Sequence, residues 1–547
     1  MGAIEKAEAH GYDSKTKIWH STRPEIKIPE DEMVDVVEWL HQRTPDREMG
    51  DHLAMVDVTT EEQLTYRELK LKVQTVAAGL SNLGINHGDV VLLLAPNSVW
   101  FPVICFGVMS LGGIITTVNP VCTTQEILKQ VKDSGAIIAI TTVSLYSKVE
   151  PIGLPTIILG AKENGLPKKT ISFSTVLAAD PDTAPRVRRK QSDTAAILYS
   201  SGTTGLSKGV VISHRNFIAV AMQLHLDGPH VERDRRYVCT LPMFHVYGLA
   251  VVVLGQLTRG GRTSLVILPK FESELFLRSL EKYRVTDVAL VPPMVLLLAQ
   301  SEIATKYDLS SVVQVSSGAA PLGKDLMGSL HQRFPTWEIR QGFGMTETSG
   351  VVSVTLYYPD RSHFGSAGEL VSSMEARVID VKTGENLPPY GQGEICVRGP
   401  TIMQGYLNNP TATAATIDSE GWLHTGDLGY FDELGRVWIV DRLKELIKYK
   451  GYQVAPAELE DLLLTHPQIM DAAVVPQPDA QAGEVPIAYV VRARNSNLTE
   501  KQIISWVARQ VSPYKRLRKV TFIAAIPKSA SGKILRKDLV QLGKSKL

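Results

Sequence analysis

Cysteine is scarce in this sequence, with four residues among 547. They stand at positions 105, 122, 239 and 396, and no two of them are spaced as CxxC. This spacing argues against a disulfide framework and against a cluster of thiolate ligands for a metal ion. We therefore expect the chain to work in a reducing compartment.

An excess of charge of either sign is also lacking. Lys and Arg number 58 and Asp and Glu number 57, which gives a formal net charge of +1. Proteins that cover nucleic acid carry a basic surface, so this balance argues against a nucleic-acid partner. Residues 1–20 are charged and have no apolar core, which argues against a secretory signal.

Long uncharged apolar runs are rare as well. One run, residues 99–118, is long enough to cross a bilayer. Pro102, Gly112 and Gly113 interrupt it, and it follows the strand-like segment "GDVVLLLAPNS". We expect a buried strand–helix–strand crossover here and no transmembrane segment.

The sequence is rich in short apolar runs that alternate with helical patterns. Up to about residue 360, runs such as "DVVLLLAP" and "DVALVPP" alternate with segments such as "TYRELKLKVQTVAAGLSNLG". This alternation is typical of an α/β fold with doubly wound parallel sheets. Closely spaced strands at about 360–440 indicate a β-rich subdomain, a distorted barrel. A helix, two strands and a helix then predict a small α+β domain, so we expect domains at 1–441 and 442–547.

A loop of small residues, "SSGTTGLSKG" at 200–209, lies between two apolar runs. Its glycines allow positive φ angles, and its uncovered N–H groups and hydroxyl groups can surround an anion. Lys208 adds a mobile positive charge, so we expect a triphosphate as the ligand. The neighbours of Lys208 do not match a Walker A loop. The alternative is a mobile surface loop rich in Gly and Ser.

Three further segments carry side chains suited to nucleotide chemistry. In "QGFGMTET" (341–348), Glu347 offers a hard oxygen of the kind that Mg²⁺ prefers. In the segment 421–460, Asp427 stands close to two glycines, where a carboxylate can accept both hydroxyl groups of a ribose. In "PKSASGKILRK", Lys533 stands between small residues. Taken one at a time, the segments also fit a tight turn with a surface Glu, a solvated basic turn and a surface hairpin.

Together these segments resemble the adenylate-forming superfamily and are most similar to plant 4-coumarate:CoA ligases and their peroxisomal relatives. "SSGTTGLSKG" resembles the phosphate loop of that family, "GEICVRG" its second box, and "DRLKELIKYKGYQVAPAELE" a further motif. The resemblance runs from "TYRELK" to "SASGKILRK". It implies a large N-terminal domain of two doubly wound sheets plus a distorted β-barrel, and a small α+β C-terminal lid domain.

The resemblance implies an ATP-dependent acid:CoA ligase that uses Mg²⁺. A carboxylate attacks the α-phosphate of ATP to give an acyl-adenylate and pyrophosphate, and the thiol of coenzyme A then takes the acyl group. Fixed positive charge has to offset the repulsion between the two anions of the first step. Rotation of the lid at Lys444 lets one pocket serve both steps.

The resemblance also assigns residues to these tasks. Lys533, His245 and Thr346 are implied in catalysis, and Glu347 is implied as the Mg²⁺ ligand. The implied ATP and AMP contacts are Ser200, Ser201, Gly202, Thr203, Thr204, Lys208, Gln341, Gly342, Thr346, Asp427, Arg442 and Lys533. The implied acid and adenylate contacts are Tyr247, Val251, Ser316, Ala319, Gly342, Gly344, Val351, Lys448 and Gln453. The implied coenzyme A contacts are Lys270, Lys450 and Gly451.

The identity of the acid stays open at this level. Ser316 and Gly350 depart from the usual hydroxycinnamate pattern, and Val251 is larger than the residue common there. A change of a few methylenes in a pocket shifts preference by roughly 1–3 kcal/mol. We expect a (hydroxy)cinnamate-like or extended aryl-alkenoic acid, with an oxylipin such as a jasmonate precursor, or a medium-chain fatty acid, as alternatives. The rival functions are a luciferase-like oxidase and a carrier-loading adenylation module, although no carrier-type serine motif follows Lys533.

The printed sequence ends in Ser545-Lys546-Leu547, which matches the peroxisomal address. We expect the peroxisomal import receptor to recognise this tripeptide, and a cytoplasmic protein otherwise. The alternative is a basic tail that ends in these residues by accident.

Overall fold

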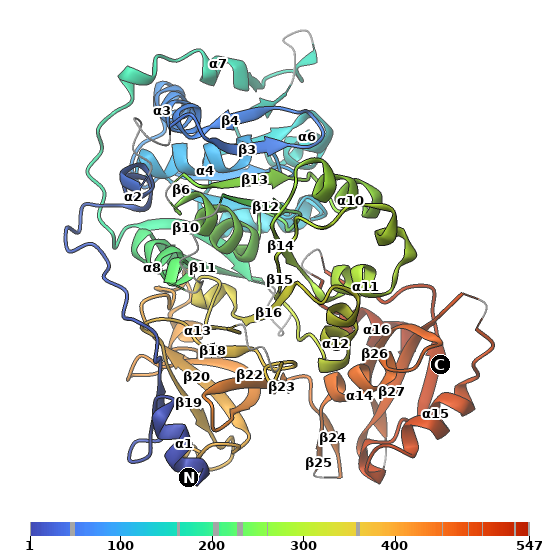
Figure 1. The fold of residues 1–547 in the computed structure, drawn as a ribbon. Coiled ribbons are helices and arrows are strands. Elements are labelled where there is room, and N and C mark those ends of the chain that lie inside the picture. Colours follow the sequence, from blue (N-terminus) through green and yellow to red (C-terminus); the bar gives the residue numbers. More distant parts are fainter. Residues whose placement is uncertain are drawn as a thin grey trace.

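Three β-sheets organise the chain (Figure 1). The computed structural model describes residues 2–43, 50–160, 165–200, 207–226, 234–259, 261–356, 361–450, 452–479, 481–494, 496–529 and 532–544. Two large sheets belong to the N-terminal part of the chain and the third to the C-terminal part. Among the described residues, no helix is both long enough and apolar enough to cross a membrane.

The eight-stranded sheet is mainly parallel and contains the expected crossover. Its spatial order is β21 (Gly405–Tyr406), β11 (Lys208–Ser213), β10 (Thr194–Ser200), β6 (Ile114–Thr117), β5 (Val90–Leu94), β7 (Ile138–Thr142), β8 (Thr156–Leu159) and β9 (Ile171–Ser172). All five residues of β5 are apolar and buried, as is typical of a parallel strand covered on both faces. Helix α4 (Trp100–Ser110) joins β5 to β6, so the buried crossover predicted at 99–118 is confirmed.

Local signals set the ends of several helices. Helix α3 (Tyr66–Asn82) begins at a capping box in which Thr65 and Glu68 exchange hydrogen bonds. Helix α5 (Thr124–Ser134) begins in the same way and ends at Gly135, whose φ is 70°. Further helices of the N-terminal part are α1 (Ala3–Ala9), α2 (Val36–Arg43), α6 (Val143–Val149), α7 (Phe173–Leu177), α8 (His214–Leu226), α10 (Ser273–Lys282), α11 (Pro292–Gln300), α12 (Lys324–Arg333) and α13 (Pro410–Ala414).

The second sheet joins a parallel half to an antiparallel half. The parallel half runs in the order β16 (Glu338–Phe343), β15 (Gln314–Ser317), β14 (Asp287–Leu290), β12 (Arg235–Cys239), β13 (Thr263–Ile267) and β3 (Leu53–Asp57), with β4 (Gln63–Thr65) antiparallel at the edge. The antiparallel half continues through β17 (Ser353–Val354), β18 (Gly368–Leu370), β23 (Arg436–Arg442), β22 (Leu423–Phe431), β20 (Gly393–Arg398), β19 (Glu375–Ile379), β2 (Ile18–His20) and β1 (Tyr12–Asp13). This half contains the β-rich region expected at about 360–440, and β1 and β2 extend it from a distant part of the sequence.

The C-terminal part has its own sheet and its own core. Its spatial order is β25 (Tyr452–Val454), β24 (Ile447–Tyr449), β27 (Gly483–Arg492) and β26 (Ile469–Asp479), and β28 (Lys519–Phe522) pairs with β27. The helices are α14 (Pro456–Leu464), α15 (Glu500–Ala508) and α16 (Arg536–Lys544). Ile447, Leu459 and Val474 are fully buried between the sheet and its helices. The predicted order of helix, strand, strand and helix is confirmed, whereas the domain boundary at 441/442 stays a prediction.

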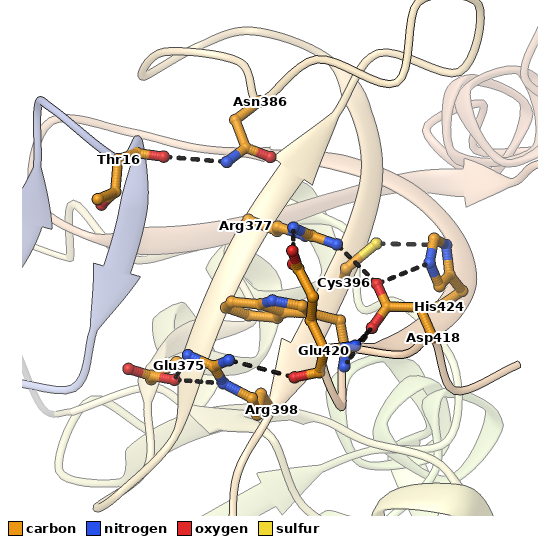
Figure 2. A network of polar contacts seen from close by, with 10 residues as sticks. Thr16, Glu375, Arg377, Asn386, Cys396, Arg398, Asp418, Glu420 and His424 are labelled. Carbon is orange, nitrogen blue, oxygen red and sulfur yellow. Dashed lines mark hydrogen bonds and ion pairs between the residues drawn. The ribbon is translucent and has the colours of Figure 1, made fainter.

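A polar network ties strands of the antiparallel half together (Figure 2). The ring of Trp422 lies 4.7 Å from the guanidinium group of Arg377 on β19 and 4.4 Å from that of Arg398 on β20. Arg377 also pairs with Asp418, with 2.7 Å between the two side chains. The network thus fixes the start of β22, the strand that carries Asp427.

The same network contains the one group in the described part of the chain whose side chains could together hold a metal ion: Glu394, Cys396 and His424. His424 Nδ1 lies 3.0 Å from a carboxylate oxygen of Glu394 and 3.5 Å from the sulfur of Cys396. Burial, together with the charge of Glu394, raises the pKa of the Cys396 thiol to about 12. These contacts join the neighbouring strands β20 and β22, and we interpret the group as a hydrogen-bonded part of the sheet.

Candidate active site

A cavity lies between the parallel half of the second sheet and the segment that follows β12. One wall consists of residues from β12, β15 and β16, and the other includes η4 (Tyr247–Leu254), a π-helical segment that continues into α9 (Gly255–Leu257). The cavity contains about 1030 Å³ of space, its open mouth included. Ten of the predicted site residues line it: His245, Tyr247, Val251, Ser316, Ala319, Gly342, Gly344, Thr346, Val351 and Lys533.

Three glycines, which carry no Cβ atom, allow the walls of this cavity to approach each other. A Cβ atom on Gly344 would lie 2.2 Å from the carbonyl oxygen of Gly350. Gly350 has a φ of +125°, and a Cβ atom there would lie 2.9 Å from Val251 on η4. A Cβ atom on Gly318 would lie 3.0 Å from the ring of Tyr247. These positions require glycine because backbone and side chains from other segments occupy the space.

Lys533 is presented by a tight turn of the C-terminal part. The Ser529 N–H donates to the carbonyl oxygen of Lys533 (2.7 Å), and the Ser529 hydroxyl accepts from the Lys533 N–H (3.1 Å). Gly532, with a φ of +82°, lies so close to Val291 that an added Cβ atom would stand 3.2 Å from the Val291 Cβ. The turn therefore rests against the residue after β14 and brings Lys533 into the cavity.

Charged residues of the N-terminal part act on the ammonium group of Lys533. Burial lowers the pKa of Lys533, and the positive charge of Arg442 lowers it further. Asp427 and Glu347 act in the opposite direction. Cations and carboxylates from both parts of the chain therefore lie close to the ammonium group of Lys533.

His245 lies at the start of η4 and faces the same cavity. The backbone N–H of His245 donates to the Pro242 carbonyl oxygen (3.1 Å). The ring Nδ1 of His245 accepts a hydrogen bond from the backbone N–H of Tyr247 (3.3 Å). Burial, and then the charge of Lys533, lower the pKa of His245 to about 4. The imidazole is therefore neutral at neutral pH and adds no charge to the site.

Asp427 and Arg442 form an ion pair across β22 and β23, in which the Asp427 side chain is buried and the Arg442 side chain is partly exposed. They are register partners, and Arg442 Nε lies 3.0 Å from Asp427 Oδ1. Asp427 Oδ2 is buried and has no hydrogen-bond partner in the described structure. A buried carboxylate oxygen without a donor is costly, so this atom fits the hydroxyl group of a ligand. The geometry suits the expected ribose contact, which stays a prediction.

Glu347 is linked to the phosphate loop by a residue that the sequence analysis missed. The Tyr406 hydroxyl donates to Glu347 Oε1 (2.9 Å), and Lys208 Nζ lies 4.4 Å from the centre of the Tyr406 ring. Tyr406 belongs to β21, which pairs with β11, the strand that begins at Lys208. No local motif pointed to Tyr406, because this pairing joins distant segments. Beyond Ser200, the predicted loop residues Ser201, Gly202, Thr203 and Thr204 lie outside the described residues.

Gln341 stands on β16 with its side chain engaged away from the cavity. Its Oε1 accepts the backbone N–H of Leu322, and its Nε2 donates to the Ser366 carbonyl oxygen (2.8 Å). Both ends of the amide are occupied, so the side chain positions the surrounding loops. The expected contact between Gln341 and adenine stays a prediction.

Besides Lys208, four predicted lysines stand outside the cavity, namely Lys270, Lys444, Lys448 and Lys450. Lys448 and Lys450 belong to the exposed hairpin of β24 and β25, and Lys444 is exposed in the turn between β23 and β24. Gly451 and the side chain of Gln453, from the same hairpin, lie outside the described residues. The structure thus places ten of the predicted site residues on one cavity and leaves the β24–β25 hairpin, with Lys448 and Lys450, outside it.

An ionic cluster that the sequence did not predict lies within the C-terminal part, beside its contact with Asp441. Arg536, at the start of α16, pairs with Glu445 (2.8 Å) and Glu460 (2.5 Å). Asp441, on β23, accepts the backbone N–H of Ala457 at the start of α14 (2.9 Å). Burial raises the pKa of Asp441 to about 7. The contact joins the last strand of the N-terminal sheet to the first helix of the C-terminal part.

Polar residues that the sequence analysis also missed line the cavity away from Lys533: Arg235, Tyr237, Gln256, Arg259, Gln314 and Arg340. Gln314 stands two residues before Ser316, and Arg340 stands two residues before Gly342. Side chains two apart on a strand share a face, so the period of the strands carried a usable signal.

Two family patterns match this chain. The pattern described as "AMP-binding enzyme" matches residues 41–407, and the pattern described as "AMP-binding enzyme C-terminal domain" matches residues 458–533. The two matches include the phosphate loop, the segment 341–348 and Lys533.

Curated relatives match along almost the whole chain. A probable CoA ligase, CCL5, from Humulus lupulus is 48% identical over 99% of this chain and 98% of its own length. Peroxisomal OPC-8:0-CoA ligase 1 from Arabidopsis thaliana is 45% identical over 98% of both chains. 4-Coumarate–CoA ligase 1 from Petroselinum crispum is 45% identical over 90% of this chain and 91% of its own.

Solved structures share the fold. ATP-bound MatB from Rhodopseudomonas palustris is similar with a TM-score of 0.84 and 29% identity, over 93% of this chain and 99% of that chain. The o-succinylbenzoate coenzyme A synthetase MenE from Bacillus subtilis, in complex with ATP and a magnesium ion, is similar with a TM-score of 0.78 and 28% identity, over 92% of this chain and 99% of that chain.

Proposed function

We propose that this chain, which belongs to the AMP-binding enzyme family and is an acid–CoA ligase, activates a (hydroxy)cinnamate-like or extended aryl-alkenoic acid as its adenylate. One observation carries the proposed mechanism: Lys533 of the C-terminal part shares a cavity with Thr346 and His245 of the N-terminal part. Such a cavity can hold a carboxylate and a phosphate together.

In the first proposed step, an oxygen of the acid attacks the α-phosphorus of ATP, and the bond to pyrophosphate breaks. Both reactants are anions, so their approach needs fixed cations in a desolvated site. Lys533 would bridge the carboxylate and the α-phosphate, and Arg442 would supply further positive charge. The neutral imidazole of His245 would lie beside the reacting carboxylate without adding a competing charge.

In the second proposed step, the sulfur of coenzyme A attacks the activated carbonyl carbon, and AMP leaves. The lid would rotate at Lys444, withdraw Lys533 and bring the β24–β25 hairpin with Lys450 to the thiol. The position of that hairpin outside the cavity supports this division, because the two groups of lysines then serve different orientations of one lid.

We propose residues for ATP and Mg²⁺ as follows. Asp427 Oδ2 would accept from a ribose hydroxyl, and Arg442 would contact ribose or phosphate. Glu347 would ligate Mg²⁺, which supplies charge neutralisation at the phosphates when bound. ATP-bound and Mg²⁺–ATP-bound related structures support this use of the site. Lys270, Lys450 and Gly451 stay the proposed contacts of coenzyme A.

The second candidate acid is an oxylipin, with a medium-chain fatty acid as a further alternative. The relative named as an OPC-8:0-CoA ligase, 45% identical, favours an oxylipin. The departures at Ser316 and Gly350 from the hydroxycinnamate pattern point the same way, since both positions line the cavity. We also propose a peroxisomal location, on the strength of Ser545-Lys546-Leu547 and that peroxisomal relative.

The test is an acid panel with ATP, Mg²⁺ and coenzyme A. Hydroxycinnamates, extended aryl-alkenoic acids, oxylipins and medium-chain fatty acids are compared by pyrophosphate release and by acyl-CoA formation. We expect the highest kcat/KM with an extended aryl-alkenoic acid. A clear preference for unsubstituted fatty acids over every aryl acid would overturn the proposed substrate class and leave the ligase assignment intact.

A further inference from the structure

The lining of the cavity changes from apolar to polar along its length. Around its middle it is lined by apolar groups such as Val251, Val351 and Val354. Beyond them it is lined by guanidinium, amide and phenol groups that belong to Arg235, Tyr237, Gln256, Arg259, Gln314 and Arg340. A pocket built only for a hydrocarbon tail would not end on these groups, because burying them against hydrocarbon is costly.

Strand geometry places these groups far from the reaction centre. Arg340, Gly342 and Gly344 follow one another on β16 and its extension, and all three line the cavity. Ser316 pairs in register with Arg340, so β15 and β16 run side by side at this level. At about 3.3 Å per residue, the distance from Gly344 to Arg340 is about 13 Å along the strand. A cinnamate skeleton falls short of this length, whereas an extended acid spans it.

Two of the three arginines are neutralised by the protein itself. Arg235 Nη1 lies 3.1 Å from Asp287 Oδ1, and both side chains are buried. Arg340 Nη2 lies 2.8 Å from a carboxylate oxygen of Glu338. These pairs are complete without a ligand and contribute little net charge to the cavity.

Arg259 is different, because it makes no ion pair in the described part of the chain. Its Nε donates to Gln256 Oε1 (2.9 Å), and its Nη2 donates to the Leu224 carbonyl oxygen. Both partners are neutral, and both residues also line the cavity. Burial, followed by the charge of Arg235, lowers the pKa of Arg259 to about 10, so the guanidinium group is still charged at neutral pH. One uncompensated positive charge therefore remains at this end of the cavity.

We infer that Arg259 binds an oxygen acceptor at the distal end of the acid substrate. The substrate is thus a carboxylic acid of extended length whose far end carries a carbonyl or a second carboxylate. The inference rests on the proposed acid-activating function of the same cavity and adds the chemistry of the acid's other end. Arg259 is a specificity-determining residue, remote from the carboxylate that reacts.

Three ten-carbon acids test this inference: decanoic acid, the analogue with a terminal methyl ketone, and the corresponding dicarboxylic acid. Acyl-CoA formation is measured with each acid for the wild type and for Arg259→Met. We expect the wild type to prefer at least one oxygen-bearing acid over decanoic acid in kcat/KM by about tenfold or more. In Arg259→Met this ratio should fall roughly 10- to 100-fold, because the terminal oxygen loses its charged donor.

The matched control is Arg236→Met. Arg236 is the next residue after Arg235 on β12, but it is exposed and donates to the Tyr283 carbonyl oxygen (3.0 Å) on the other side of the strand. We expect the ratio to stay at its wild-type value in this variant. Preference for the ketone identifies a carbonyl as the acceptor, and preference for the diacid identifies a carboxylate. Either result supports the inference.

Two results would overturn it. One is a wild-type enzyme that prefers decanoic acid to both oxygen-bearing acids. The other is an equal loss for all three acids in Arg259→Met, which would give Arg259 a structural role at Leu224 and Gln256 only.

If Arg259→Met lowers the melting temperature markedly, Arg259→Lys is the deciding variant. In Arg259→Lys the ratio of kcat/KM for the oxygen-bearing acid to that for decanoic acid should fall several-fold, because a shorter cation keeps only part of the contact. Activity with decanoic acid but not with its oxygen-bearing analogues refutes this inference alone, whereas absence of activity with every extended acid refutes the proposed substrate class.

Discussion

Replacing Lys533 with Ala removes the cation that the C-terminal turn contributes to the cavity. We expect Lys533→Ala to slow pyrophosphate release by roughly 10²–10³-fold, since a positioned charge beside the developing phosphate charge is lost. Thioester formation from supplied acyl-adenylate should stay close to the wild-type rate, because in the proposed mechanism Lys533 leaves the cavity before that step. The two half-reactions are measured separately.

Lys537→Ala is the control for this variant. Lys537 is exposed on α16, a few residues from Lys533, and does not line the cavity. It should leave both half-reactions unchanged. Comparable losses in both half-reactions of Lys533→Ala would contradict the proposed division of labour between the two lid positions.

A second variant, Asp427→Asn, tests the nucleotide contact. The amide keeps the size of the side chain but gives up the charge that pairs with Arg442 and the buried acceptor Oδ2. We expect KM for ATP to rise about tenfold or more, because hydrogen bonds to charged groups are worth about 1.5–3 kcal/mol. Isothermal titration with ATP and steady-state kinetics measure the change. An unaltered KM for ATP with a reduced KM for the acid would place Asp427 elsewhere in the mechanism.

At the scale of single residues, the sequence predicted the site residues that stand in motifs. It did not predict residues whose roles depend on contacts with distant segments. Lys533, Thr346 and His245 were expected together, and the structure places them on one cavity. Tyr406 and Arg259 had no local signal, because their neighbours lie far away in the sequence. A side chain that depends on tertiary contacts for its role cannot be recognised from its immediate neighbours.

Among the elements, β23 and α14 form the joint between the two parts of the chain. Asp441 on β23 accepts from the start of α14, and its pKa is raised from an ordinary 3.8 to about 7 by burial. A docked lid therefore binds a proton that an undocked lid releases between these pH values. Docking should be strongest at low pH, should weaken as the pH rises from about 4 to about 7, and should stay constant above that.

The distance between a fluorophore pair on the two parts, followed from pH 5 to pH 8.5, measures this dependence. Asp441→Asn should reduce it, because the amide does not titrate, whereas Asp461 on α14, whose pKa burial also raises to about 7, keeps part of it. Asp538→Asn, on the exposed first turn of α16, serves as the control and should keep it in full. An undiminished pH dependence in Asp441→Asn would assign the titration to another group.

Element order was largely predictable, and sheet membership was less so. Alternating apolar runs predicted β5, β14 and their neighbours, since buried parallel strands are apolar throughout. The short strands β1 and β2 went unpredicted, because a strand of two or three residues has too little pattern to be recognised. Their place is set by pairing with β19, more than 350 residues later in the chain.

For the whole molecule, the sequence's last three residues predict an address. Deletion of Ser545-Lys546-Leu547 should leave the kcat/KM of acyl-CoA formation unchanged, because a receptor and not the cavity would recognise the tripeptide. A fluorescent protein fused to the N-terminus should lose its overlap with a peroxisomal marker after the deletion. Leu547→Glu, which keeps the length, should have the same effect. Undiminished overlap in either variant would refute the peroxisomal address.

A change of pattern along the sequence predicted the division into a large part and a small lid. Alternating βα units are followed by closely spaced strands and then by a separate α+β pattern. The orientation of the lid did not follow, because it depends on side chains that meet only in space. Asp441 with the start of α14, and Gly532 against Val291, are such contacts.

The contact between Gly532 and Val291 has a consequence for the fate of the activated acid. While the turn is seated there, the lysine beside it occupies the cavity where a thiol, or water, would have to enter. A mixed anhydride is prone to hydrolysis, and in the proposed mechanism a lysine that leaves the cavity only when the lid rotates would limit its exposure to solvent. A substitution that weakens the contact between Gly532 and Val291 should therefore yield more AMP than acyl-CoA, because part of the activated acid would be hydrolysed.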